Sequence, residues 1–527
     1  MRQILCTTDG GSNRTHFRPY LYSPVVSVCL ALLLVVRARA DEKTMASGGN
    51  RRKKADDRLS TLPLPVLHRI LTFLPTKHAV QTCILSKRWE DLWASVPALD
   101  LDDDLFPYAF PCKEKKKPQS DGHREAEAAL SKETTTLPDF VYRVMALRYG
   151  SNLQGFRLLL HNNYWAPCVD TWLCYAVRHS VQKVEISFCS EQRYRLPRWL
   201  LRCSSLQDMK LDLQNSLVDL PSCISLPNLE SLKLAHLRVN AGSSVQQLLC
   251  GCPKLKVFTM RSCWLPKANA FDVSSCSCLE SLSLEGNQLL VMNIINFSAP
   301  KLKSLAIENS IRMFSGSLAI SAPNLLYLKY IDDILGEFRI NLPMLLDAVV
   351  FWNASCSLSE LEAESRVRFL RGLKHARTLR FCASYIENLS RIMDLLICKS
   401  CSFSNLKHLE LKISGHYHDV VCFLLCCPSI ETLVIEMTNR NGGGNSAGND
   451  FPCGYSLHDL KEVEIRWFGE TDTVVNLMKF LLKSALVLEK MIVNNPTVKL
   501  DQQKQKEISQ KLLTCPRAST RMLVLFF

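Results

Sequence analysis

The sequence predicts an α/β fold: a short helical module near the N-terminus, then a solenoid whose parallel strands line its concave face, then a C-terminal cap. Two observations predict it. Apolar residues recur in the frame LxxLxL at steps of about 23 to 26 residues, and Asp57–Leu101 carries apolar residues at helical spacing instead. The chain has 527 residues, 47% apolar and 22% charged, which is the composition of a globular protein with several domains.

The net charge of +14 is spread along the chain, apart from basic runs at Arg51–Lys54 and Lys113–Lys117. Such runs serve as solvated linkers, nuclear-import signals or nucleic-acid patches. Neither run contains the aromatic residues that stack on bases, so we expect no nucleic-acid partner. The 23 cysteines are odd in number and scattered. They indicate buried free thiols in a reducing compartment, cytoplasmic or nuclear, and not a disulfide framework.

Residues 1–56 are expected to be a disordered extension with a basic linker, although part of it resembles a secretory signal. Val25–Val36 is an apolar run of 12 residues that follows arginines and precedes Ala38-Arg39-Ala40. The run is too short to span a bilayer, and we expect no membrane partner. Met45 offers a second start close to the helical module, so the extension is read either as an upstream addition or as a working export signal.

The helical module consists of three short apolar runs. Leu67, Ile70, Leu71 and Leu74 form one helical stripe, which Pro75 ends because proline has no N–H for the next turn. Thr76 is placed to cap a second helix. A third run carries Trp89, Leu92, Trp93 and Val96 at helical spacing. So few residues cannot bury two tryptophans and this aliphatic surface alone, so part of it must face another element or protein.

Residues 57–104 resemble an F-box, the module that docks a substrate receptor onto the Skp-type adaptor of a cullin ubiquitin ligase. The matching residues are Leu62-Pro63, Ile70-Leu71, Leu74-Pro75, Ala79-Val80, Cys83, Ser86–Trp89 and Leu92-Trp93. The resemblance implies a three-helix fold and a set of residues that hold or face the adaptor: Leu62, Pro63, Leu67, Ile70, Leu71, Leu74, Trp89 and Trp93.

Residues 105–136 are polar, charged and rich in proline, and are predicted to be a linker. Residues 137–440 carry the repeats, whose period lies in the leucine-rich-repeat range. In each LxL pair the two side chains enter the core, while the residues between them point to the concave face. The predicted anchors are Leu153/Phe156/Leu158, Val181/Val184/Ile186, Leu206/Met209/Leu211, Leu229/Leu232/Leu234, Leu255/Phe258/Met260, Leu279/Leu282/Leu284, Leu302/Leu305/Ile307, Leu325/Leu328/Tyr330, Leu345/Ala348/Val350, Ala376/Leu379/Phe381, Leu406/Leu409/Leu411 and Ile430/Leu433/Ile435.

The charged residues between and beside the anchors are the candidates for binding a target protein on the concave face. Charged side chains on an exposed face are often only solvated, so each single candidate is weak. The convex side is expected to carry short helices such as Val245–Leu249. The candidates are Lys210, Asp212, Lys233, Arg261, Glu285, Glu308, Lys329, Arg380, Glu410 and Lys412.

Residues 441–454 include Gly442–Gly444 and are predicted to be a flexible loop. Residues 455–527 contain two more strands of the same frame, Leu460/Val463/Ile465 and Leu488/Met491/Val493, and between them an apolar helical stripe. This region is similar to the FBD domain of many plant F-box/leucine-rich-repeat proteins, and it would cap the open end of the solenoid.

No catalytic motif is present, so we predict that the chain is not an enzyme and needs no cofactor. Cys398-x-x-Cys401 and His416-x-His418 have too few residues between the histidines for a zinc site, so no metal is expected. Two functions stay open. One is the substrate-recognition subunit of an SCF-type (Skp-cullin-F-box) E3 ubiquitin ligase, which binds the adaptor and an unknown target. The other is a secreted or membrane-exported leucine-rich-repeat recognition protein.

Overall fold

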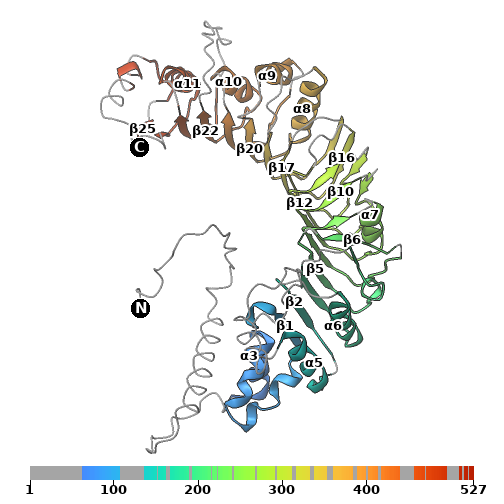
Figure 1. Ribbon diagram of the computed structural model, residues 1–527. Helices are drawn as coiled ribbons and strands as arrows, with labels where there is room; N and C mark the ends of the chain where they lie inside the picture. Colours follow the sequence, from blue (N-terminus) through green and yellow to red (C-terminus); the bar gives the residue numbers. More distant parts are fainter. Residues whose placement is uncertain are drawn as a thin grey trace, which may run out of the picture. The chain divides into compact units, whose positions relative to one another are not determined.

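The computed structural model describes residues 62–106 and 136–526, except residues 151, 162–165, 189–192, 215, 222, 240–242, 267–269, 291–293, 311–315, 333–336, 353–359, 384–388, 399–400, 414–416, 439–455, 469–470, 495–507, 509, 513–514, 520 and 521. It divides the chain into two compact units, Met1–Leu159 and Leu160–Phe527 (Figure 1). The apolar run Val25–Val36, both basic runs and Gly442–Gly444 lie outside the described residues. No helix within the described ranges is long and apolar enough to cross a membrane.

The first unit begins with the predicted helical module, in shorter pieces than expected. Helices α2 (Leu64–Leu71) and α3 (Thr76–Gln81) are followed by three 3₁₀ turns, η1 (Thr82–Ile84), η2 (Lys87–Trp89) and η3 (Leu92–Ser95). The third apolar run forms two 3₁₀ turns, η2 and η3, instead of one helix, because the backbone of Asp91 between them is not helical (φ −110°, ψ 0°).

Thr76 does not cap α3. Pro75 occupies the N-cap position, and no side chain caps the helix. The Thr76 hydroxyl instead accepts a hydrogen bond from the Asp100 N–H at 2.8 Å. Since Asp100 lies in strand β1 (Ala98–Asp102), this bond ties the helical module to the strand that follows it.

Strand β1 pairs in parallel with β2 (Gly155–Leu159), so the first unit contains the start of the repeats as well as the module. Arg157 of β2 lies 2.9 Å from the Asp100 carboxylate. Helix α5 (Leu137–Leu147) precedes β2, and Thr136 caps it by accepting the Asp139 N–H. Phe106, which falls in the predicted linker, is buried beside Phe140 of α5, so packing continues past the expected boundary.

In the second unit a parallel sheet follows the predicted repeat frame, with its strands on the inner side of a curve and helices outside (Figure 1). The anchors are buried in every predicted repeat, and they face one another from strand to strand, as Leu232 does with Phe258. The strands that precede the C-terminal cap are β3 (Lys183–Ser187), β5 (Asp208–Asp212), β7 (Ser231–Ala235), β9 (Val257–Arg261), β12 (Ser281–Glu285), β15 (Ser304–Glu308), β17 (Tyr327–Ile331), β19 (Asp347–Phe351), β20 (Thr378–Ala383), β21 (His408–Ile413) and β22 (Thr432–Thr438).

The outer side contains more strand than the sequence indicated. Helix α7 (Ser243–Cys250) confirms the expected short helix, and α6 (Ala166–Arg178), α8 (Glu360–Gly372), α9 (Leu389–Cys398) and α10 (Tyr417–Leu425) accompany other repeats. The repeats between them carry two small parallel sheets instead. One sheet comprises β4 (Tyr194–Arg195), β6 (Leu217–Asp219), β8 (Arg238–Val239), β10 (Trp264–Pro266) and β13 (Gln288–Leu290); the other comprises β11 (Ala270–Asp272), β14 (Ile294–Asn296), β16 (Ser317–Ser321) and β18 (Glu337–Asn341).

A buried row of polar side chains links neighbouring repeats where the inner strands end. Asn287 accepts the Cys263 N–H at 2.9 Å and donates to the Met260 carbonyl at 2.8 Å. The next residue in the row, Ser310, receives the Asn287 N–H on its hydroxyl, and its own N–H binds the Asp332 carboxylate at 2.6 Å. These bonds satisfy backbone groups that the turns leave without strand partners.

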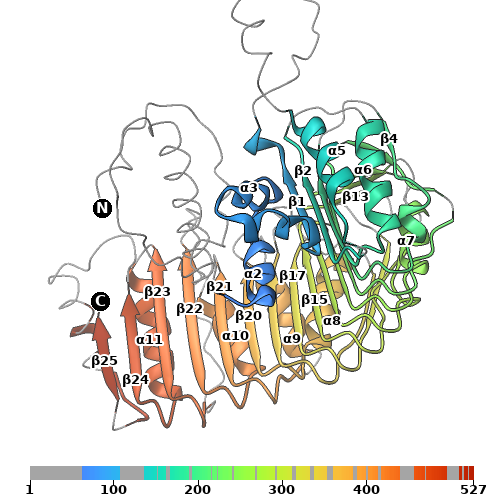
Figure 2. The same cartoon turned by 90° about the horizontal axis from the view of Figure 1, so that it is seen from below.

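The C-terminal region extends the same sheet through β23 (Glu462–Phe468), β24 (Lys490–Asn494) and β25 (Leu523–Phe526). Leu433 and Ile435 of β22 face Val463 and Ile465, which is the register that the frame predicts. Helix α11 (Thr471–Ser484) buries Leu477 on the outer side of these strands (Figure 2). The region therefore belongs to the repeat unit and adds the last strands of its sheet, and its role as a cap stays a prediction.

Candidate protein-binding surfaces

The residues expected to hold or face an adaptor separate into a core set and a surface set. Leu67, Leu71, Leu74 and Trp89 lie in one buried cluster of the helical module, and Trp89 is 0% exposed. A residue buried in this way can shape a docking surface from beneath but cannot touch a partner. In the free chain these four hold the short helices of the module together, and their part in adaptor binding stays a prediction.

Of the other four, Leu62 and Trp93 are partly buried and pack against that cluster. Pro63 is exposed and starts α2. The Leu62 carbonyl accepts a hydrogen bond from Arg88 at 2.7 Å, which fixes the segment that enters the helix. Ile70 is half-buried. These four reach the surface, and their contact with an adaptor remains a prediction.

A second apolar stripe of α2 faces solvent, and the sequence reading did not single it out. Val66 and Phe73 are 42% and 52% exposed, and Ile70 lies between them at helical spacing. We call Val66, Ile70 and Phe73 the outer face of α2; Phe73 lies two residues past the last helical residue, Leu71. A row of exposed large apolar side chains marks a candidate surface for a partner. The same spacing, read from Val66 instead of Leu67, could have identified it.

On the inner face of the second unit, the target-binding candidates are mostly paired with one another. Among the ten candidates, Lys233 alone has no ion pair within the described residues. We call the nine paired candidates and their partners the ionic ladder. One of its pairs is Asp212 with His236, whose Nδ1 lies 2.9 Å from the carboxylate. Its remaining pairs are Lys210 with Glu185 at 2.7 Å, Arg261 with Glu285 at 2.8 Å, Lys329 with Glu308 at 2.7 Å, Arg380 with Glu410 at 3.2 Å and Lys412 with Glu436 at 2.5 Å.

A second charged row runs along the edge where the inner strands begin. Glu230 pairs with Lys256 at 2.9 Å, and Glu280 pairs with Lys303 at 2.8 Å. The hydrogen bond from Lys303 and its charge lower the pKa of Glu280, and the bond to Glu230 raises the pKa of Lys256. The pattern recurs further along the chain in Lys407 and Glu431, where the pair lowers the pKa of the glutamate. Both rows are exposed and therefore contribute more to solubility and partner selection than to stability.

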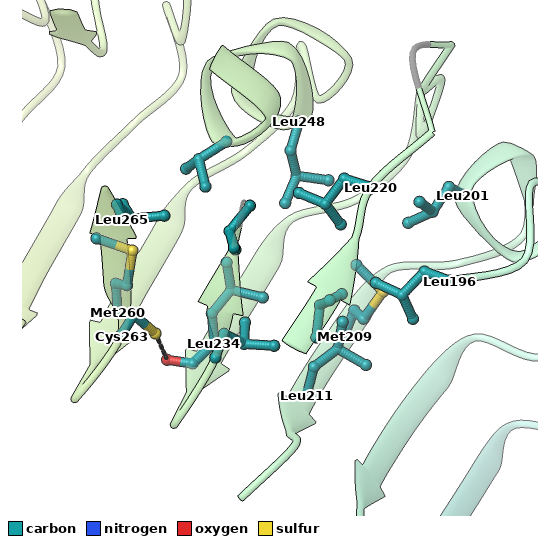
Figure 3. Close-up of a pocket in the computed structure, with 14 residues that line it drawn as sticks. Leu196, Leu201, Met209, Leu211, Leu220, Leu234, Leu248, Met260, Cys263 and Leu265 are labelled. Atoms are coloured by element: carbon teal, nitrogen blue, oxygen red, sulfur yellow. Dashed lines mark hydrogen bonds between the residues drawn. The ribbon is translucent and has the colours of Figure 1, made fainter. Parts of the chain in front are cut away.

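An apolar space inside the repeats does not form a ligand site. Figure 3 shows it between β5, β7, β9 and the outer strands, lined by apolar side chains such as Leu211, Leu248 and Met260. The room for the centre of a water molecule is about 10 Å³, which is no more than one water needs. Burial also raises the pKa of the neighbouring Cys263 thiol to about 12, so it stays protonated and unreactive at neutral pH.

Both parts of the chain are similar to known protein families. Residues 59–100 match the F-box domain, residues 169–346 match the repeats of the family "FBD-associated F-box protein At5g56370, LRR repeats", and residues 270–525 match "At1g61320/AtMIF1, LRR domain".

Similar full-length proteins come from Arabidopsis thaliana. "FBD-associated F-box protein At5g56380" is 27% identical over 482 residues, covering 89% of this chain and 100% of that protein. "F-box/FBD/LRR-repeat protein At1g78750" is 26% identical over 503 residues, covering 91% and 98%. "F-box protein At3g03040" is 28% identical over 484 residues, covering 87% and 94%.

Proposed function

We propose that this chain, a plant-type F-box/leucine-rich-repeat protein with an FBD-like C-terminal region, is the substrate-recognition subunit of an SCF-type E3 ubiquitin ligase. An F-box implies binding of a Skp-type adaptor, and the repeats imply binding of a target, so the chain has the general role of a substrate-recognition adaptor. We further propose that the adaptor links this chain to a cullin.

The observation that carries the proposal is the outer face of α2. It presents Val66 and Phe73 to solvent, although each side chain is large enough to favour burial. The helix is held from within by Leu67, Leu71 and Trp89, so the face is already formed before a partner arrives. A preformed apolar face lowers the ordering cost of binding, which favours a stable adaptor complex.

In this role the chain positions the target and catalyses no step itself. The F-box would hold the adaptor and, through it, the cullin that carries the ubiquitin-transfer machinery. The repeat face would hold the target so that its lysines meet the activated ubiquitin at high effective concentration. Such a complex forms in the cytoplasm or the nucleus, which is where we place the protein.

The test is reconstitution with a plant Skp-type adaptor, a cullin and its RING subunit. The full chain should elute with all three in size-exclusion chromatography and should be ubiquitinated itself when the remaining enzymes are added. A chain in which Leu62-Pro63 is replaced by two alanines should lose most adaptor binding, since it lacks both a packed leucine and the fixed start of α2. A well-folded chain that binds the adaptor but recruits no cullin would contradict the ligase assignment.

A further inference from the structure

The charged rows of the repeat unit are interrupted by large apolar side chains where β17 and β19 lie side by side. The row along the strand-start edge continues from Lys303 through Leu326 and Leu346 to Arg377. In this row each residue donates its backbone N–H to the carbonyl of the residue before it. Two adjacent leucines thus replace the charged residues of the neighbouring repeats. The exposed fractions of Leu326 and Leu346 are 40% and 39%.

The interruption continues across the inner face. In the ladder positions of these two strands, Ile331 faces Phe351, and Lys329 faces Val349. Ile331, Val349 and Phe351 are each partly exposed, and the turn before β19 adds Met344 with 57% exposure. We call Leu326, Met344, Leu346, Ile331, Val349 and Phe351 the apolar stripe. It crosses the face from the strand-start edge toward the strand ends.

Ion pairs border the stripe on both sides. Before it lie Glu280 with Lys303 and Glu308 with Lys329; after it lie Arg380 with Glu410 and Lys407 with Glu431. A target that bound over those pairs would have to replace interactions that already satisfy their charges. Over the stripe it would only have to displace water from apolar surface, which is the favourable term in most protein associations.

The strand-start edge beside the stripe is positive. Lys303 and Arg377 border the two leucines, and no acidic residue occupies that row between Glu280 and Glu431. Arg377 has no ion pair within the described part of the chain, and Lys301 is exposed nearby. Asp347 is the one exposed acid directly beside Leu346. A hollow of about 240 Å³ next to Leu326, lined also by Glu280, Lys301, Lys303 and Asn324, leaves room for a side chain of the partner.

We propose that the repeats bind their target at the apolar stripe. The bound part of the target is a segment with large apolar side chains flanked by carboxylates. The apolar side chains lie on the stripe, and the carboxylates meet Arg377 and Lys301, which have no ion pair within the described residues. This inference rests on the proposed function and specifies the chemistry of the target.

The experiment uses the full chain bound to its Skp-type adaptor and a labelled synthetic peptide, Glu-Glu-Leu-Phe-Leu-Glu-Glu, whose phenylalanine is replaced by a photoreactive analogue for cross-linking. One control peptide carries lysine in place of glutamate, and another carries serine in place of leucine and the aromatic residue. The protein variants are Leu346→Glu and, as the matched control, Leu361→Glu. Leu361 is 74% exposed on α8, outside the stripe.

We expect the acidic apolar peptide to bind at least tenfold more tightly than either control peptide and to cross-link within residues 326–351. Leu346→Glu should weaken it at least tenfold, and Leu361→Glu should leave it unchanged. Equal binding by the Leu346→Glu variant, cross-links elsewhere, or self-association through the stripe would overturn the inference. None of these results affects adaptor binding. A chain that binds the peptide but not the adaptor would refute the proposed function instead.

Discussion

Replacing Asn287 by alanine tests how much the buried polar row of Asn287, Ser310 and Asp332 stabilises the repeats that it links. The side chain is 2% exposed and serves the Cys263 N–H and the Met260 carbonyl at 2.9 and 2.8 Å. Asn287→Ala leaves both groups buried without that partner, and each such group costs about 1–3 kcal/mol. We expect the free energy of unfolding to fall by roughly 2–6 kcal/mol, which is a large part of the total for an ordinary domain.

The measurement is urea unfolding of the full chain followed by circular dichroism, with Asn324→Ala as the matched control. Asn324 also bonds a carbonyl of the preceding repeat, that of Pro300 at 2.7 Å, but it does so at the surface, where water can replace it. The control should lose about 1 kcal/mol or less. If the two variants unfold at the same urea concentration, the buried row does not stabilise the repeats in the way described.

Three further predictions concern stability. Trp89→Ala removes the largest side chain of the helical module core and should destabilise the first unit by about 3–5 kcal/mol. Selective proteolysis of the module would detect this loss, and unchanged resistance to the protease would contradict the core role of Trp89. Burial raises the pKa of the Cys252 thiol to about 12 from 9.0. The protonated thiol therefore stabilises the folded chain below pH 9, and this stabilisation is lost as pH rises toward 12. The urea midpoint should therefore fall between pH 8 and pH 10, and by less in Cys252→Ala; an equal fall would show that this thiol is not the cause. Ending the chain after Gly444 removes β23, β24 and β25, which should lower the melting temperature of the repeats and promote aggregation through the bare edge of β22; an unchanged melt would make the C-terminal region an independent domain.

The repeat solenoid could be predicted because its signal is redundant. Anchors such as Leu232, Phe258 and Leu282 recur at a fixed period, and all of them are buried in the predicted register. The outer strands could not be predicted in the same way. Pieces as short as Arg238–Val239 carry no periodicity of their own and become strands only because a neighbouring repeat places a partner beside them.

The candidate binding residues were harder to predict, because the type of a residue does not reveal what lies beside it. Lys412 and Glu410 were chosen as exposed charges, and the structure shows that each already has a partner on the next strand or the one before. The exposure of Leu346 could not be predicted, because apolar residues in a repeat are usually buried. Trp89 matches a motif that is expected to hold or face the adaptor, but a motif gives the identity of a residue and not its exposure, and Trp89 is buried.

The central claim, that the chain docks to a Skp-type adaptor through the outer face of α2, is tested most directly by measuring adaptor affinity. Isothermal titration should compare the full chain with the double variant Val66→Glu/Phe73→Glu and with Leu147→Glu. Leu147 is a matched control that is 64% exposed at the end of α5 in the same unit.

About half of each outer-face side chain remains to be buried, which corresponds to roughly 1 kcal/mol each, and the two new carboxylates would be desolvated as well. We expect at least a hundredfold loss of affinity in the double variant and no change in Leu147→Glu. Wild-type affinity in a well-folded double variant would contradict docking through the outer face of α2.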